Sequence, residues 1–113
     1  MEFCQNNKEF RVEILEKIIK EIVPNAKIRT VYRPTGANET YFADKREGSC
    51  QMYYLVINDH KNYLFPAPVT FERFEEKKGF NGSSTPGNLQ KIIPAELVRN
   101  ELRWEIKTPG QLI

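Results

Sequence analysis

The chain has 113 residues, a common size for a single domain, and we expect one domain over residues 1–113. Its 17 basic and 15 acidic residues leave a formal net charge of +2, which is too small to indicate a strongly basic nucleic-acid-binding protein. Leu, Ile, Val and Phe exceed the roughly one-fifth of residues below which chains tend to stay disordered, so a packed core is expected.

The two cysteines, Cys4 and Cys50, lie far apart and belong to no Cys/His cluster. The sequence therefore predicts neither a metal site nor a cofactor. Isolated cysteines without a disulfide framework favour a reducing cytoplasm. No apolar run approaches about 18 residues, and the amino-terminal residues lack the layout of a secretion signal. We expect a cytoplasmic protein without a membrane partner.

Residues 7–23 have the periodicity of an amphipathic helix. At about 100° per residue, the apolar side chains fall on one broad arc and the charged side chains on the other. Glu13 and Lys17 form an i,i+4 pair in the favourable order, and Pro24 ends the helix. The wide apolar arc favours burial within the chain's own domain over the alternative, a helix that binds a partner.

After residue 26 the apolar period changes from 3.6 to 2, which predicts a β region over residues 26–113. The expected strands are 26–33, 41–44, 50–57 and 62–69, followed by a hairpin of 89–98 and 102–107 around residues 99–101. Residues 50–57 are apolar on both faces, which is typical of a central strand. Pro66 and Pro68 lack amide donors, so the second half of 62–69 must lie at an edge or leave the sheet.

Two further segments complete the expected domain. Residues 70–80 have the pattern of a short helix that is capped by Thr70 and ended by Gly79. Residues 81–88, NGSSTPGN, are rich in turn-forming residues and are the loop expected to be most flexible. The predicted fold is α+β: an N-terminal amphipathic helix packs on a curved antiparallel sheet or a small SH3-like β-barrel. Prolines at the strand ends favour the strongly curved version over an open sheet.

His60 is the only histidine, and it lies between two expected strands within the segment NDHK. Such residues are common at hairpin tips, so His60 is expected to be exposed in a turn. A catalytic histidine needs a nucleophile and an orienting group within about 3 Å. Cys50 cannot supply that nucleophile, because an extended strand at about 3.3 Å per residue separates it from the turn. The sequence contains no GxSxG, P-loop or HExxH motif, and we predict no catalytic residue.

The most basic part of the sequence lies between residues 26 and 48. Its cations are Lys27, Arg29, Arg33, Lys45 and Arg46. With a tyrosine nearby, these residue types could hold a phosphate backbone and stack a base, so weak nucleic-acid binding is one alternative function. The simpler interpretation, which we favour, is a solvated sheet face whose charges discourage aggregation at the edge.

The run YLFPAP at residues 63–68 has two interpretations. It is either a core strand leading into a stiff connector, or a proline-rigid ledge that presents a surface to a partner. The ledge comprises Tyr63, Phe65, Pro66, Ala67 and Pro68, which are the candidate partner-binding residues. Trp104 lies in an alternating strand and is expected in the core rather than at a ligand platform.

The second half of the chain carries a spaced series of short motifs. They are Tyr63-Leu64-Phe65-Pro66-x-Pro68, Phe80, Pro94-Ala95-Glu96-Leu97, Arg103-Trp104-Glu105-Ile106 and Gly110-x-Leu112. Over about residues 53–112 this series resembles a small SH3-like β-domain that serves as an accessory unit in multidomain bacterial, especially cyanobacterial, signalling proteins. Ala67 stands where that pattern usually has a polar residue. The resemblance implies a non-catalytic β module and transfers no active site.

Taken together, these patterns predict a non-enzymatic interaction module of a bacterial multi-component system that binds another protein. Its contact surface is expected at the ledge and at loop 81–88. Weak nucleic-acid binding through the basic face is the first alternative, and a small enzyme with an unrecognised site is the second. The sequence leaves the partner's identity and the oligomeric state open.

Overall fold

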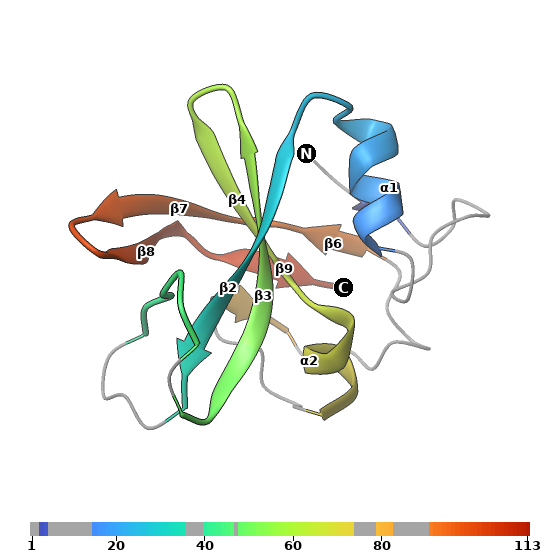
Figure 1. The fold of residues 1–113 in the computed structure, drawn as a ribbon. Helices are drawn as coiled ribbons and strands as arrows, with labels where there is room; N and C mark the ends of the chain where they lie inside the picture. The colour runs from blue at the N-terminus through green and yellow to red at the C-terminus, as the bar shows by residue number, and fades with distance from the viewer. Residues whose placement is uncertain (1–2, 5–14, 36–39, 47, 74–78, 83–90) are drawn as a thin grey trace.

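The computed structural model describes residues 3–4, 15–35, 40–46, 48–73, 79–82 and 91–113 (Figure 1). In chain order the elements are β1 (Phe3–Cys4), α1 (Leu15–Ile22), β2 (Lys27–Pro34), β3 (Cys50–Asn58), β4 (Lys61–Pro66), α2 (Pro68–Arg73), β5 (Phe80–Asn81), β6 (Lys91–Ile93), β7 (Ala95–Asn100), β8 (Arg103–Thr108) and β9 (Gly110–Leu112). The described part is mainly antiparallel β-sheet with short helices, so it has less helical character than the predicted α+β class.

The main sheet has the strand order β2-β3-β4-β7-β8, and every neighbouring pair in it is antiparallel. Two-residue turns join β3 to β4 and β7 to β8. The first residue of each turn, Asp59 or Glu101, has a positive φ of 55° or 57°. Asp adopts this left-handed conformation more readily than Glu. His60 is exposed in the first of these turns, which confirms its predicted position.

The main sheet curls until its two edge strands meet a common bridge, the segment Phe42-Ala43. Ala43 exchanges two backbone hydrogen bonds of 2.8 and 2.9 Å with Tyr32 of β2. Phe42 exchanges two more, also of 2.8 and 2.9 Å, with Trp104 of β8. The bridge thus supplies hydrogen-bond partners to backbone groups of both edge strands, at Tyr32 and at Trp104. This arrangement confirms the predicted barrel-like curvature.

The inside of the curl is filled by an inner core cluster to which all five strands and the bridge contribute. Its members are Val31, Phe42, Tyr53, Leu55, Leu64, Ala95, Leu97 and Trp104. The rings of Phe42 and Tyr53 meet edge to face with centroids 5.0 Å apart, a favourable aromatic geometry. Trp104 is 7% exposed, which confirms its predicted place in the core.

A second core cluster lies on the opposite face of β3 and β4, under α1 and the smaller sheet. It contains Leu15, Ile19, Val56, Phe65, Ile92 and Leu112. Alternate residues of β3 enter the two clusters: Leu55 points inward and Val56 outward. Both faces of β3 are therefore covered, as its apolar sequence predicted. The smaller sheet has the order β1-β6-β9-β5, in which β5 and β9 are parallel.

The helices agree with the sequence only in part. α1 is the C-terminal part of the helix predicted over 7–23, and residues 7–14 lie outside the described residues. α2 begins at Pro68, an ordinary first helical residue, so Thr70 is not its cap. The Thr70 hydroxyl instead donates a hydrogen bond to the Met52 carbonyl on β3. None of the described helices has the length and apolar character needed to cross a membrane.

Three further predicted segments have different bounds in the structure or lie partly outside the described residues. The strand predicted over 89–98 is divided into β6 and β7 by Pro94, which cannot donate to a sheet ladder. In the predicted loop 81–88, Asn81 belongs to β5, while residues 83–88 lie outside the described residues. Likewise, residues 74–78 of the helix predicted over 70–80 lie outside them.

Candidate functional site

A cleft of about 390 Å³ opens between segment 41–45 and the turn of the β7–β8 hairpin. Its lining residues are Tyr41, Ala43, Asp44, Lys45, Arg99, Leu102 and Arg103, and we refer to it as the hairpin cleft. It combines three cations and one carboxylate with an aromatic ring and two aliphatic side chains. In the view of Figure 1, the hairpin turn lies at the opposite side of the molecule from α1.

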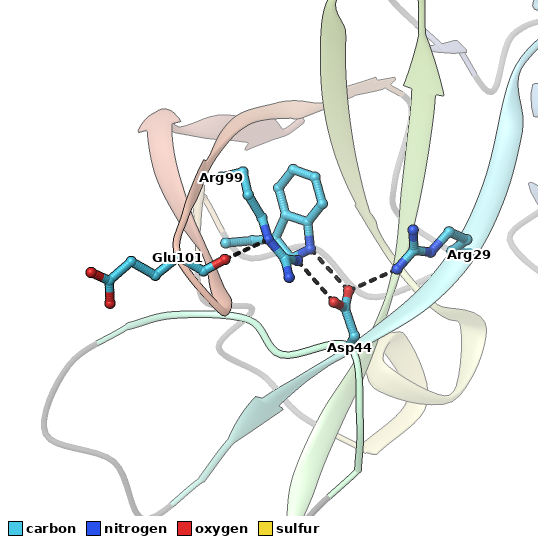
Figure 2. A network of polar contacts seen from close by, with 5 residues as sticks. Arg29, Asp44, Arg99 and Glu101 are labelled. Atoms are coloured by element: carbon cyan, nitrogen blue, oxygen red, sulfur yellow. Dashed lines mark hydrogen bonds and ion pairs between the residues drawn. The ribbon is translucent and has the colours of Figure 1, made fainter.

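Asp44 is the centre of the polar network at the cleft (Figure 2). Its Oδ1 accepts hydrogen bonds from Arg29 Nη2 at 2.9 Å and from Trp104 Nε1 at 3.0 Å, and its Oδ2 accepts one from Arg99 Nη1 at 2.8 Å. These three donors come from β2, β8 and β7 respectively. Because Asp44 directly follows the Phe42-Ala43 bridge, one carboxylate joins both edges of the curled sheet.

The charge state of Asp44 fits a structural role. Burial acts to raise the pKa of Asp44, but the hydrogen bonds from Trp104 and Arg99 and the charges of Arg99 and Arg29 outweigh it. The pKa is therefore lowered from its ordinary value of 3.8. A general acid or base near neutral pH requires the opposite shift. Asp44 is therefore ionised near neutral pH, where it accepts hydrogen bonds from Arg29, Arg99 and Trp104.

Both arginines of the hairpin are positioned by aromatic rings. The Arg99 guanidinium lies 4.9 Å from the Trp104 ring centroid, and Arg99 Nε donates a hydrogen bond of 2.9 Å to the Glu101 carbonyl. The Arg103 guanidinium lies 4.4 Å from the centroid of the Tyr41 ring. Such stacking restricts a long side chain that would otherwise sample many rotamers. The guanidinium groups of Arg99 and Arg103 are thus restricted in position.

The predicted basic face is divided by the structure. Lys27, Lys45 and Arg46 are exposed, and Arg29 is paired with Asp44. Arg33 is only 8% exposed, and its Nε is buried without a hydrogen-bond partner among the described residues. The five cations therefore do not act as one solvated surface, and only Lys45 lines the hairpin cleft.

The predicted ledge is largely interior. Phe65, Pro66 and Ala67 are buried, while Tyr63 and Pro68 are half-buried. The Phe65 side chain belongs to the second core cluster, and the Ala67 amide donates a hydrogen bond of 3.2 Å to the Met52 carbonyl. Within the single chain, the middle of the ledge is placed to pack the domain and offers no surface to a partner.

The reactive side chains weighed in the sequence analysis, Cys50 and His60, lie at opposite ends of β3. Outside the gaps in the described chain, no group of three or more His, Cys, Asp or Glu side chains is placed to hold a metal ion. Cys50 is a free, half-buried thiol at the start of β3. His60 lies at the far end of that strand, in the exposed turn.

Of the residues that line the cleft, only Lys45 was a candidate site residue in the sequence analysis. The partners of Asp44 on the hairpin lie 55 and 60 residues away along the chain, so no local pattern could join them. One signal was available, since Leu102 is an apolar residue next to a strand reversal, where polar residues are usual.

No protein-family model matches this chain, and no curated protein or solved structure is significantly similar to it. The hairpin cleft and its surroundings therefore carry the functional proposal.

Proposed function

We propose that this chain is a non-enzymatic interaction module that binds another protein at the hairpin cleft. The observation that carries this proposal is the position of Leu102. It is 85% exposed at the hairpin turn, on the lining of a cleft in which Arg99 already donates a hydrogen bond to Asp44. One exposed leucine is ordinary on a protein surface, but this leucine adjoins arginines that stack on aromatic rings, and both residue types are enriched at protein interfaces.

Preorganisation strengthens the proposal. Asp44 holds Arg99, and Arg99 in turn holds the Glu101 carbonyl in the turn that presents Leu102. A partner that docks there loses less free energy to the ordering of side chains than it would on a mobile loop. The left-handed φ of Glu101 is an uncommon conformation for this residue type, and such backbone is often retained at functional sites.

The proposal moves the contact surface from the ledge to the hairpin cleft, because Phe65, Pro66 and Ala67 are buried. It retains the role that the sequence suggested. The resemblance of residues 53–112 to a small SH3-like accessory β-domain supports a non-catalytic part in a bacterial multi-component system. A cytoplasmic location belongs to the same proposal.

Nucleic-acid binding is the second candidate function. Lys45 and Arg46 are exposed next to the cleft, and Tyr41 contributes an aromatic ring, so cations and a ring that could stack a base occur together. Against it, Arg29 is neutralised by Asp44, Arg33 is buried, and the net charge is only +2. Protein binding therefore remains the preferred function.

The experiment that tests the proposed function compares two exposed apolar residues of one hairpin. Leu102 lines the cleft, whereas Val98, which is 41% exposed, does not. Immobilised wild-type chain and the variants Leu102→Ser and Val98→Ser are used to capture proteins from extract of the source cells. We expect one specific partner to be retained by the wild type and Val98→Ser and lost with Leu102→Ser. Equal capture by all three would contradict the proposed cleft.

A salt series separates the two candidate functions. Binding of a generic oligonucleotide that weakens steeply with rising salt indicates phosphate contacts, because these release counterions. We expect no such binding. If it occurs and is lost with Lys45→Glu, the nucleic-acid function replaces the proposed one.

A further inference from the structure

We infer that Arg33 forms a binding site for a small carboxylate anion near one end of the β2–β3 ladder. This inference goes beyond the proposed function and does not depend on it, since Arg33 lies outside the lining of the hairpin cleft. Two observations carry it: the burial of a guanidinium group whose Nε has no acceptor, and the position of Arg33 close to the end of the paired strands.

Arg33 is buried on the inner face of the curled sheet. Val31, two residues before it on β2, belongs to the inner core cluster. Alternate side chains of a strand share a face, so Arg33 lies on the same side of β2 as Val31. The residue is only 8% exposed, and its Nε has no hydrogen-bond partner among the described residues. A charged group therefore lies largely out of water without the acceptor that its Nε–H needs.

The neighbouring groups on the described strands do not compensate this cation. No ion pair of the described residues involves Arg33, and Asp44 already accepts three hydrogen bonds from other residues. The residue directly across the ladder is Gln51, a neutral amide whose Oε1 accepts a hydrogen bond of 2.9 Å from the Tyr53 hydroxyl. Buried charges in proteins are normally paired, because desolvation of an isolated ion is costly. An anion from solution supplies the missing partner.

The chemistry of the guanidinium defines the ligand. Its Nε–H and a neighbouring Nη–H lie in one plane and suit the two oxygens of a carboxylate. One guanidinium balances one negative charge, so a monocarboxylate fits better than a doubly charged phosphate, whose second charge stays uncompensated. The low exposure of Arg33 admits only a small molecule. The Arg33–Gln51 pair is followed by Pro34–Cys50, the last pair of the ladder, so the site lies near the end of the sheet.

The probe is acetate, added to the full-length chain labelled with ¹⁵N, with sodium chloride of equal ionic strength as the reference. The Nε–H signal of Arg33 reports directly on the site and is identified by its loss in Arg33→Met. We expect acetate to shift this signal with a Kd of about 10 mM, and chloride to leave it in place. About 100 mM acetate should also raise the Tm by roughly 3–6 °C over chloride, because a ligand that binds only the folded state stabilises it.

Three variants separate this site from general salt effects. Arg33→Met removes the guanidinium and is expected to abolish the difference in Tm between acetate and chloride. The matched control is Arg46→Met, which makes the same change at an exposed arginine and should keep the full difference. Arg33→Lys keeps the charge but replaces the planar pair of donors with an ammonium, so we expect it to weaken acetate binding roughly tenfold. If Arg33→Met does not fold, titration of the Nε–H signal in the wild type decides the question.

Each other outcome overturns a defined part of the inference. Greater stabilisation by inorganic phosphate than by acetate disproves the carboxylate assignment, and tighter binding of benzoate than of acetate disproves the restriction to small ligands. If acetate raises the Tm of the wild type and of Arg33→Met equally, the anion binds elsewhere. If acetate leaves the Nε–H signal of Arg33 unshifted, the site does not exist. Protein binding at the hairpin cleft survives all of these results, because the capture experiment with Leu102→Ser tests it separately.

Discussion

The indole N–H of Trp104 donates a hydrogen bond of 3.0 Å to Asp44 Oδ1, across 60 residues of sequence. The Trp104 backbone also exchanges two hydrogen bonds with Phe42, which lies two residues before Asp44. One tryptophan therefore binds the bridge of the curled sheet twice, through its main chain and through its ring nitrogen. The same Trp104 contacts therefore close the curled sheet and fix Asp44, which lines the cleft.

Replacement of Asp44 by Asn tests this connection. The amide provides one acceptor where the carboxylate provides two, and it loses the attraction of Arg29 and Arg99. Because these groups are partly exposed, we expect the free energy of unfolding to fall by only about 1–2 kcal/mol. Urea denaturation measures it. Asp59→Asn makes the same change in an exposed turn and is expected to alter stability by less than about 0.5 kcal/mol. Equal effects at both sites would argue against the network.

The lowered pKa of Asp44 makes part of the stability depend on pH. Burial opposes the shift, but hydrogen bonds and the two arginines give a folded-state pKa below the ordinary value of 3.8. A carboxyl group with a lowered folded-state pKa stabilises the fold above its unfolded pKa, and this contribution disappears as pH falls through the folded-state pKa. The stability difference between wild type and Asp44→Asn should therefore be constant from pH 7 to about 5 and shrink below about 4. A difference that grows on acidification contradicts the assignment.

Much of the main sheet was predictable because local pattern and burial agree. The two-sided apolar run at 50–57 became β3, which supplies Leu55 to one core and Val56 to the other. The hairpin of β7 and β8 was also predicted, but its turn lies at Glu101-Leu102 rather than around Asn100. Glu101 takes a left-handed φ that usually indicates Gly, Asn or Asp, so no local pattern indicated a turn at this exact position.

The cleft and the ledge could not be assigned from the sequence, since long-range pairing decides both. Asp44 meets donors on three strands that are distant in the chain. The ledge has the same stiff, apolar sequence whether it is exposed or buried, so its composition does not distinguish the two. Its burial follows from the register of β4 on β3, which places Phe65 opposite Tyr54 and within the second core cluster. No local pattern contains that register.

Arg33 provides a test of how a buried cation affects the fold. It is 8% exposed, and its Nε has no hydrogen-bond partner among the described residues. Methionine has a similarly long, apolar side chain, so Arg33→Met removes the buried Nε–H group that has no acceptor among the described residues. We expect the free energy of unfolding to stay equal or to rise by up to about 2 kcal/mol. Arg46→Met, at an exposed position, should change it by less than about 0.5 kcal/mol. A clear loss with Arg33→Met alone would show that the guanidinium is engaged.

Gly110 begins β9 at a point where the smaller sheet leaves no room for a side chain. A Cβ there would lie 2.5 Å from the Ile93 carbonyl oxygen and 2.5 Å from the Phe80 ring, so one of these groups must move. We expect Gly110→Ala to lower the free energy of unfolding by about 1–3 kcal/mol, the usual cost of overpacking. Thermal or urea unfolding measures the loss.

The matched control for this glycine is Gly48→Ala. Gly48 has a left-handed φ of 62° but nothing within 4 Å of an added Cβ, so the variant tests backbone strain without a clash. Its expected cost is about 1 kcal/mol. Gly110→Ala should also speed hydrogen exchange of the amides that join β5 and β9, including the Gly110 amide that donates to the Gly79 carbonyl at 2.9 Å. Gly48→Ala should leave those amides protected, because it lies outside the smaller sheet. If Gly48→Ala is the more destabilising variant, or if exchange between β5 and β9 is unchanged in Gly110→Ala, the packing described for β9 is wrong.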